Sequence, residues 1–302
     1  MSIAEKSFRK GEVIIKEGDM GDSFFCVMEG KVGVYADYTK KEPFRLAILE
    51  AGEFFGEMAI LEEYPRSATI VAESNVVLIE IPGNEMMKFF GENPDQVIEL
   101  MRHLGNRIQA MAADYADAEA LLKQMRESDE AKKSKSLFSK IKKHINTYQA
   151  NKNKLNEPDT EKLRKEFEEI KGKETGELKT YGKGMIVFKE GKEDDCMYIL
   201  HDGAVGMYSN YRKKDEQKLA EVQAISFFGE MGIISDEPRS VSAVAEAGGA
   251  TVETVRQEDI ERMVKTCPVK VEMILRHMSF RLRRLNLDFL NTCKEITETY
   301  GN

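Results

Sequence analysis

The feature that most constrains this chain is an internal repeat. When the sequence is shifted by 173 positions, residues 8–73 align with residues 181–246 without a gap, and 28 of the 66 pairs are identical. Beyond this stretch, one inserted residue brings the segment beginning at Met101 into register with the segment beginning at Leu275. Two copies of this length predict two similar domains, each about the size of a small independent core.

Each copy begins with short alternating apolar runs that glycines interrupt, a pattern typical of β-strands joined by tight turns. In the first copy the alternating residues are Val13, Ile15, Phe25, Val27, Val32 and Val34. From Met86 onward the apolar residues follow helical spacing, and Asp95 after Pro94 is the expected start of a long second helix. The pattern predicts an α+β fold in which each copy is a small β-roll, or jelly-roll, followed by helices.

The repeat also predicts the domain organisation. We expect the first domain, with its C-terminal helix, over residues 1–126 and the second over residues 158–302, joined by a basic helical linker over 127–157. We also expect a helix beginning at Thr160, capped by Asp159, to lead into the second roll.

The linker has an unusual charge pattern. Residues 131–155 contain eight lysines and no acidic residue, and four apolar or aromatic side chains share one helical face: Phe138, Ile141, Ile145 and Tyr148. Such a helix either packs on its own protein, which is the favoured interpretation, or contacts a membrane surface or an acidic partner.

Composition excludes several classes of protein. The net charge of −8 argues against bulk affinity for nucleic acid, and no apolar segment is long enough to span a bilayer or act as an export signal. The four cysteines are far apart and form no CxxC pair, which indicates reduced thiols in a cytoplasmic protein. Because no catalytic signature is recognisable, we expect the protein not to be an enzyme and to need no cofactor.

The most informative part of the repeat is a cassette that reads FFGEMAILEEYPRSATIVA from Phe54 and FFGEMGIISDEPRSVSAVA from Phe227. Gly56 allows close backbone approach to a ligand, and the free amides at the start of a short helix favour an anion. Arg66 can pair with that anion through two parallel donors, and Ser67 adds a hydroxyl. Because Glu57 would repel an anion, it is expected to accept from a neighbouring neutral hydroxyl. An anion site beside a hydroxyl acceptor is suited to a ribose phosphate.

These residues resemble the phosphate-binding cassette of cyclic nucleotide-binding domains, and the preceding EGDMGDSFFCVMEGKVGVY resembles the first strands of that family. The family includes the regulatory subunit of cAMP-dependent kinase and the bacterial cAMP receptor protein. The resemblance covers each repeat and implies two eight-stranded β-rolls with flanking helices, joined by the helical linker.

The resemblance also implies a role for each cassette residue. The glutamate accepts from the ribose 2′-hydroxyl, the arginine pairs with the cyclic phosphate, the glycine and the following amides approach the ribose phosphate, and the serine contacts phosphate or base. The implied ligand-binding residues are Gly56, Glu57, Met58, Ala59, Arg66 and Ser67 in the first cassette, and Gly229, Glu230, Met231, Gly232, Arg239 and Ser240 in the second. A surface ion pair between glutamate and arginine is the alternative, which two intact cassettes disfavour.

Two further pairs of residues match between the repeats. Tyr115 and Phe289 are candidate lids that would cover the base, although rings at helical spacing are equally typical of a packed core. His103 and His277 also match, and packing is favoured over metal binding because no convergent ligands are visible.

We therefore expect a receptor with two cyclic nucleotide sites, more consistent with cAMP than with cGMP, that regulates a partner protein through ligand-dependent helix rearrangement. The alternatives are a separately encoded regulatory subunit of a kinase or other enzyme, and a structural protein with relic cassettes. DNA binding is not expected, because too little chain follows the second roll for a helix-turn-helix module. Only about ten residues precede the first roll, so an inhibitory segment like that of the kinase subunit is not expected there.

Overall fold

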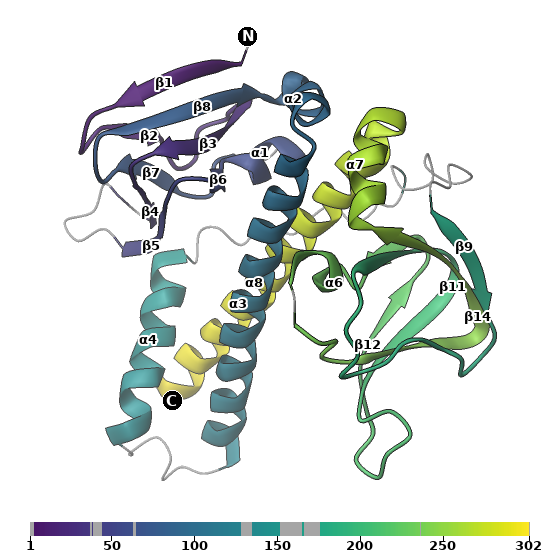
Figure 1. Cartoon of the computed structure of the whole chain (residues 1–302). Coiled ribbons are helices and arrows are strands. Elements are labelled where there is room, and N and C mark those ends of the chain that lie inside the picture. Colours follow the sequence, from purple (N-terminus) through teal and green to yellow (C-terminus); the bar gives the residue numbers. More distant parts are fainter. Residues whose placement is uncertain are drawn as a thin grey trace. The chain divides into compact units, whose positions relative to one another are not determined.

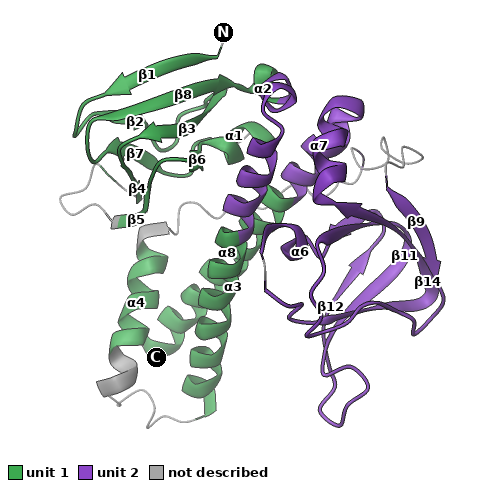
Figure 2. Ribbon diagram, viewed as in Figure 1, with its two compact units in different colours: residues 1–86, 106–158, 278–302 green, residues 87–105, 159–277 purple. Residues whose placement is uncertain are grey.

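The computed structural model describes residues 3–36, 38, 44–62, 65–127, 135–151, 165, 176–235 and 237–301 (Figure 1). The chain divides into two compact units (Figure 2): unit 1 comprises residues 1–86, 106–158 and 278–302, and unit 2 comprises residues 87–105 and 159–277. The predicted domain boundaries follow the repeat in the sequence, whereas the units follow spatial contacts. Those boundaries therefore remain a prediction.

Unit 1 contains the first β-roll, built from two antiparallel four-stranded sheets with strand orders β1-β8-β3-β6 and β2-β7-β4-β5. The strands are β1 (Ala4–Phe8), β2 (Val13–Ile15), β3 (Ser23–Glu29), β4 (Val32–Ala36), β5 (Phe44–Leu49), β6 (Phe54–Phe55), β7 (Thr69–Ala72) and β8 (Val76–Pro82). The eight-stranded roll predicted from the sequence is confirmed for this copy.

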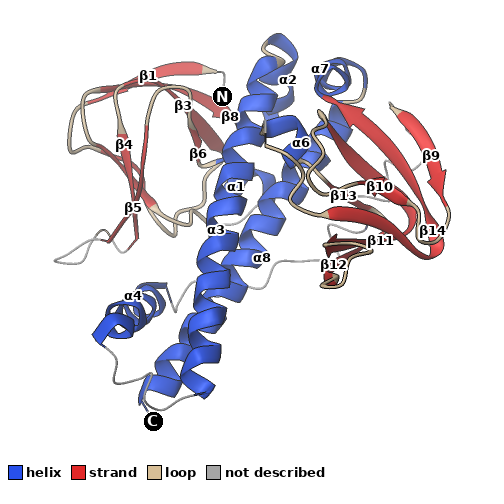
Figure 3. Ribbon diagram, turned by 60° about the horizontal axis from the view of Figure 1, so that its bottom comes forward, coloured by secondary structure: helices blue, strands red, loops and turns tan. Residues whose placement is uncertain are grey.

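Unit 2 contains the second roll, whose six described strands belong to a single antiparallel sheet (Figure 3). They are β9 (Glu177–Tyr181), β10 (Ile186–Phe188), β11 (Cys196–Ser209), β12 (Gln217–Gln223), β13 (Ser226–Phe228) and β14 (Ser242–Arg256). By the repeat register, β11 corresponds to β3 and β4 together, and β14 to β7 and β8 together. The β11–β14 pairing shifts register around Gly203. A long strand bends at such an irregularity, so six strands form the roll that eight form in unit 1.

The two roll interiors use equivalent aromatic pairs. Phe25 and Phe55 stack in the first roll with ring centroids 5.2 Å apart, and Tyr198 and Phe228 stack in the second at 5.3 Å. The first pair joins β3 to β6, and the second joins β11 to β13; β6 and β13 are the strands with which the two cassettes begin. The inward-facing residues of the alternating runs form these cores, as the period-2 pattern predicts.

The helices follow the rolls. They are η1 (Gly83–Glu85, a 3₁₀ turn), α2 (Met86–Glu92), α3 (Asp95–Glu127) and α4 (Lys135–Asn151) after the first roll, and α7 (Gln257–Thr266) and α8 (Pro268–Gly301) after the second. The predicted start of the long helix at Asp95 is confirmed. The helix predicted from Thr160, with its Asp159 cap, lies outside the described residues except for Lys165.

In unit 1, α4 packs with the later parts of α3 and α8. We call this group the helical cluster; its buried residues are Ala118, Leu121, Leu122, Met125, Ile141, Phe289, Leu290, Cys293 and Ile296. Ile145 and Tyr148 pack against it, so the apolar face of the linker helix contacts its own protein. This agrees with the favoured interpretation; the side chain of Phe138 lies outside the described residues. Among the described residues, no helix is both long and apolar enough to cross a membrane.

Unit 2 contains a buried ionic network near the start of α8. Both carboxylate oxygens of Glu253 on β14 lie 2.7 Å from the Lys270 ammonium, and the His201 ring lies 2.7 Å from one of them. Glu253 and Lys270 are both 0% exposed. Because buried charges are tolerated only when they are paired, this network fixes the start of α8 to the second roll.

Candidate functional site

The first cassette lies between β6 and β7 and includes the short helix α1 (Glu57–Glu62). Gly56, just before α1, has a φ of +81°, which favours glycine, and a Cβ there would lie 2.6 Å from the Arg66 guanidinium. The glycine is therefore needed for both the backbone turn and the close approach of the arginine.

Arg66 is buried inside this loop. Its Nη1 donates to the Gly56 carbonyl at 2.7 Å, and its Nη2 donates to the Ser23 carbonyl. The side chain is only 8% exposed. Burial lowers the pKa of Arg66, while the negative charges of Glu57, Asp22 and Glu80 raise it. A guanidinium held by carbonyl oxygens is a fixed positive charge with further donor capacity, which is suitable for an anion.

Glu57 is also buried, at 2% exposed, and its Oε1 lies 2.8 Å from Nη1 of Arg107 on α3. Arg107 was not among the site residues predicted from the sequence. The repeat contained a signal for it, because Arg107 aligns with Arg281 in the second copy. Arg107 fixes the position of the Glu57 side chain beside Arg66, and the carboxylate oxygens keep lone pairs that can accept from a ligand hydroxyl.

The second cassette repeats this arrangement between β13 and β14, with the short helix α6 (Met231–Ile234). Arg239 is buried, and its Nη1 donates to the Gly229 carbonyl at 2.6 Å, as Arg66 does to Gly56. The guanidinium carbon lies 4.3 Å from the centre of the Phe188 ring. Glu230, the counterpart of Glu57, is buried as well.

One difference between the cassettes was missed at the sequence level. Nη2 of Arg239 donates to the Cys196 carbonyl, equivalent to Ser23, and also pairs with the carboxylate of Asp194. The repeat alignment places Asp194 opposite Gly21, so the difference in residue type is visible in the sequence. Only the fold shows that the Asp194 carboxylate reaches Arg239.

The remaining predicted residues differ in burial. Ala59 and Gly232 are buried, Met58 and Met231 are half-buried, and Ser67 and Ser240 are exposed. The serine residues are thus accessible from solvent, whereas each glutamate and arginine is buried.

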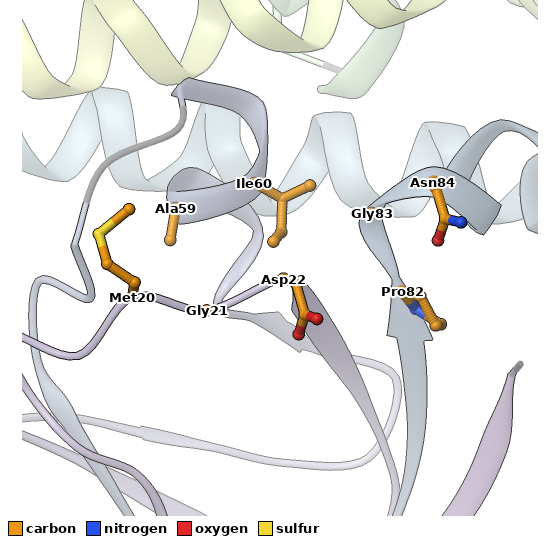
Figure 4. Close-up of a pocket in the computed structure, with 8 residues that line it drawn as sticks. All are labelled: Met20, Gly21, Asp22, Ala59, Ile60, Pro82, Gly83 and Asn84. Carbon is orange, nitrogen blue, oxygen red and sulfur yellow. The ribbon is translucent and has the colours of Figure 1, made fainter. Parts of the chain in front are cut away.

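A cavity of about 450 Å³ adjoins the first cassette (Figure 4). Its lining comes from three segments: Met20, Gly21 and Asp22; Ala59 and Ile60; and Pro82, Gly83 and Asn84. The volume lies within the range of small-molecule pockets. The lining combines apolar carbon with one carboxylate and one amide.

The two candidate lids lie together in the helical cluster. Phe289 is buried there, and Tyr115 packs against the cluster while its hydroxyl donates to Glu119 at 2.9 Å. A lid role for either ring remains a prediction. His277 contacts the Phe227 ring, with centroids 5.4 Å apart, and no group of three or more metal-ligating side chains was found within the described part of the chain.

Comparisons with known proteins identify a family for both copies of the repeat. The family described as "Cyclic nucleotide-binding domain" matches residues 5–93 and 178–267. A cGMP-dependent protein kinase of Plasmodium berghei is 25% identical over 238 residues, which cover 79% of this chain and 21% of the kinase. A cAMP-dependent protein kinase regulatory subunit of Dictyostelium discoideum is 22% identical over 289 residues, covering 95% of this chain and 72% of the subunit.

A solved structure described as "cAMP bound PfPKA-R (141-441)" is 21% identical to this chain, covers 89% of it and 75% of that protein, and superposes with a TM-score of 0.37. The family match stands on its own, because it includes both copies of the repeat and more than half of the chain. The chain therefore belongs to the cyclic nucleotide-binding domain family, of which it carries two tandem copies.

Proposed function

We propose that this protein is a receptor with two sites for a 3′,5′-cyclic nucleotide, and that ligand binding regulates a partner protein. The observation that carries the proposal is the repeated pair of buried charges: Arg66 with Glu57, and Arg239 with Glu230. An arginine supplies donors to a phosphate, and a buried carboxylate accepts from a ribose hydroxyl.

The same burial argues against relic cassettes. Enclosing a charged side chain costs several kcal/mol unless its partners offset that cost. A cassette that no longer binds a ligand has no evident reason to keep such a charge at equivalent positions in both copies.

We further propose cAMP as the preferred ligand, with cGMP as the alternative. Ser67 and Ser240 motivate this choice, because serine accompanies cAMP in the bacterial receptor that the cassettes resemble. The relatives are divided: the Plasmodium kinase is named for cGMP and the Dictyostelium subunit for cAMP. Both relatives are named for dependence on a cyclic nucleotide.

A second candidate is a regulatory subunit that docks on a separately encoded kinase. The Dictyostelium relative favours it, because the similarity extends over 95% of this chain. In either case the chain acts by binding and not by catalysis, and the partner would sense a change in the helices that follow the rolls.

Calorimetry of the nucleotide-stripped protein with cAMP and with cGMP tests the proposal. We expect two sites per chain, with cAMP the tighter ligand. Arg66→Lys and Arg239→Lys should each weaken its own site by about 1.5–3 kcal/mol, because lysine keeps the charge but loses the paired donors. No binding of either nucleotide, or a double variant that binds like the parent, would overturn the receptor function. Tighter cGMP binding at both sites would overturn the cAMP preference alone.

A further inference from the structure

The two cassettes differ at one position beside the arginine. In the repeat register Gly21 aligns with Asp194, while the next residue is aspartate in both copies, Asp22 and Asp195. The substitution therefore adds one carboxylate to the second cassette that the first one lacks.

In the first cassette this position must remain without a side chain. A Cβ built on Gly21 would lie 2.2 Å from Nη2 of Arg66, too close for any residue other than glycine unless the arginine moves. The guanidinium is therefore approached on that side by glycine backbone alone.

In the second cassette the same position carries a carboxylate that reaches the guanidinium. Oδ1 of Asp194 pairs with Nη2 of Arg239 and also lies 3.6 Å from the Cys196 thiol. The Asp194 side chain is 25% exposed, whereas that of Arg239 is 5% exposed. The carboxylate thus covers the guanidinium from the partly open side.

The position of this contact matters for anion binding. A guanidinium has two edges that can each donate two parallel hydrogen bonds: one formed by Nη1 and Nη2, the other by Nε and Nη2. Both edges therefore include Nη2. On Arg239, Nη1 already donates to the Gly229 carbonyl, and Nε is buried without a hydrogen-bond partner among the described residues. A phosphate that pairs with Nε and Nη2 would have to displace the Asp194 carboxylate or lie directly beside it.

We propose that Asp194 is an internal competitor for the ligand phosphate at Arg239, so that the two sites have unequal affinities. This inference rests on the proposed function. The first site binds the cyclic nucleotide directly, whereas the second binds only when the Asp194 carboxylate leaves Nη2. The protein then responds at two ligand concentrations: a low one that fills the first site and a higher one that fills the second.

Each site is measured separately in the full-length chain by calorimetry with cAMP. Arg66→Lys weakens the first site, and in this background Asp194→Asn and Asp194→Gly report on the second. Asparagine keeps the shape of the side chain but removes its charge. Because adjacent like charges cost several kcal/mol, both changes should tighten the second site by at least about tenfold. Glu193→Gln is the matched control: it removes an exposed neighbouring carboxylate and should change affinity by less than about twofold.

The reciprocal change tests the same idea at the other site. With Arg239→Lys weakening the second site, Gly21→Asp should weaken the first by at least about tenfold more than Gly21→Asn does, because both add a side chain that crowds Arg66 and only aspartate adds the charge. Circular dichroism and thermal unfolding establish that each variant is folded. If Asp194→Asn does not fold, the difference between Gly21→Asp and Gly21→Asn decides.

The outcomes separate this inference from the receptor function. A parent protein that binds no cyclic nucleotide overturns both. Two sites of equal affinity, insensitive to Asp194→Asn and to Gly21→Asp, overturn the competitor role and leave the receptor function intact. Weaker binding after Asp194→Asn would mean that the carboxylate supports the site and would also overturn the competitor role.

Discussion

At the scale of single residues, equivalent glutamates in the two rolls form ion pairs that differ in burial. Glu253 is fully buried and paired with Lys270, whereas its counterpart Glu80 pairs at 3.1 Å with Lys6, whose side chain is 49% exposed. The position is the same in both sheets, but solvent reaches only the pair in the first roll. The energetic consequence of losing the lysine should therefore differ sharply.

Lys270→Met is expected to lower the free energy of unfolding by about 3–5 kcal/mol, because it leaves the Glu253 carboxylate buried without its cation. Lys6→Met is the matched control and should cost less than about 1 kcal/mol, as expected of an exposed ion pair. Urea unfolding monitored by circular dichroism measures both. Equal effects of the two substitutions would show that burial does not determine the strength of these pairs.

At the scale of structural elements, the helical cluster contains a buried histidine on α4. Nδ1 of His144 lies 3.6 Å from the Cys293 thiol, and the ring meets Phe289 edge-on with centroids 5.9 Å apart. Burial lowers the pKa of His144 below its usual 6.5, with a further lowering from Lys143, while Asp114 and Asp117 oppose it. Burial also raises the pKa of Cys293 to about 12, so the thiol is neutral and unreactive.

This lowered pKa predicts a pH dependence of the cluster. Well above pH 6.5 His144 is neutral in both states. As the pH falls through 6.5 the unfolded chain binds the proton more readily than the folded one, so stability falls as the pH decreases toward the folded-state pKa. The urea midpoint of the parent should therefore decrease from pH 7 to about pH 5 more than that of His144→Leu. His103→Gln serves as the control and should keep the dependence of the parent. Parallel curves for parent and His144→Leu would refute the prediction.

The cluster also bears on the candidate lids. Phe289→Ala should destabilise the cluster by about 3–5 kcal/mol, because the ring is buried. If the ring also covers a ligand, the variant loses affinity at the second site, and Tyr115→Ala loses affinity at the first. Tyr148→Ala is the control, since Tyr148 packs on the cluster but is not a lid candidate. Calorimetry with cAMP that shows unchanged affinity in a folded Phe289→Ala protein would assign the ring to packing alone.

At the scale of the whole molecule, the question is whether ligand binding is relayed through helices. A ligand can shift helix arrangement only as far as it prefers one arrangement over another. We expect cAMP to reduce hydrogen exchange in both cassettes and to change it in residues 110–125 and in α4. The variant carrying both Arg66→Lys and Arg239→Lys should show neither change. Protection confined to the cassettes would mean that binding is not relayed through these helices.

The sequence alone determined the features that depend on local pattern and repetition. The repeat predicted two rolls, alternating apolar residues marked their strands, and the start of α3 at Asp95 followed from the change to helical spacing. The cassettes were recognisable because glycine, glutamate and arginine keep a fixed spacing in both copies. These signals persist without tertiary structure because backbone sterics and periodicity act over a few residues.

Only the tertiary structure decided which distant charges meet. Arg107 lies 50 residues from Glu57 and Asp194 lies 45 residues from Arg239, so no periodicity links them, yet each pair is in direct contact. The fold likewise decided that the linker helix buries His144 in the helical cluster, and that β11 runs continuously where the first roll has two strands. Such contacts depend on how whole elements pack, and the same sequence pattern permits several packings until burial and charge pairing select one.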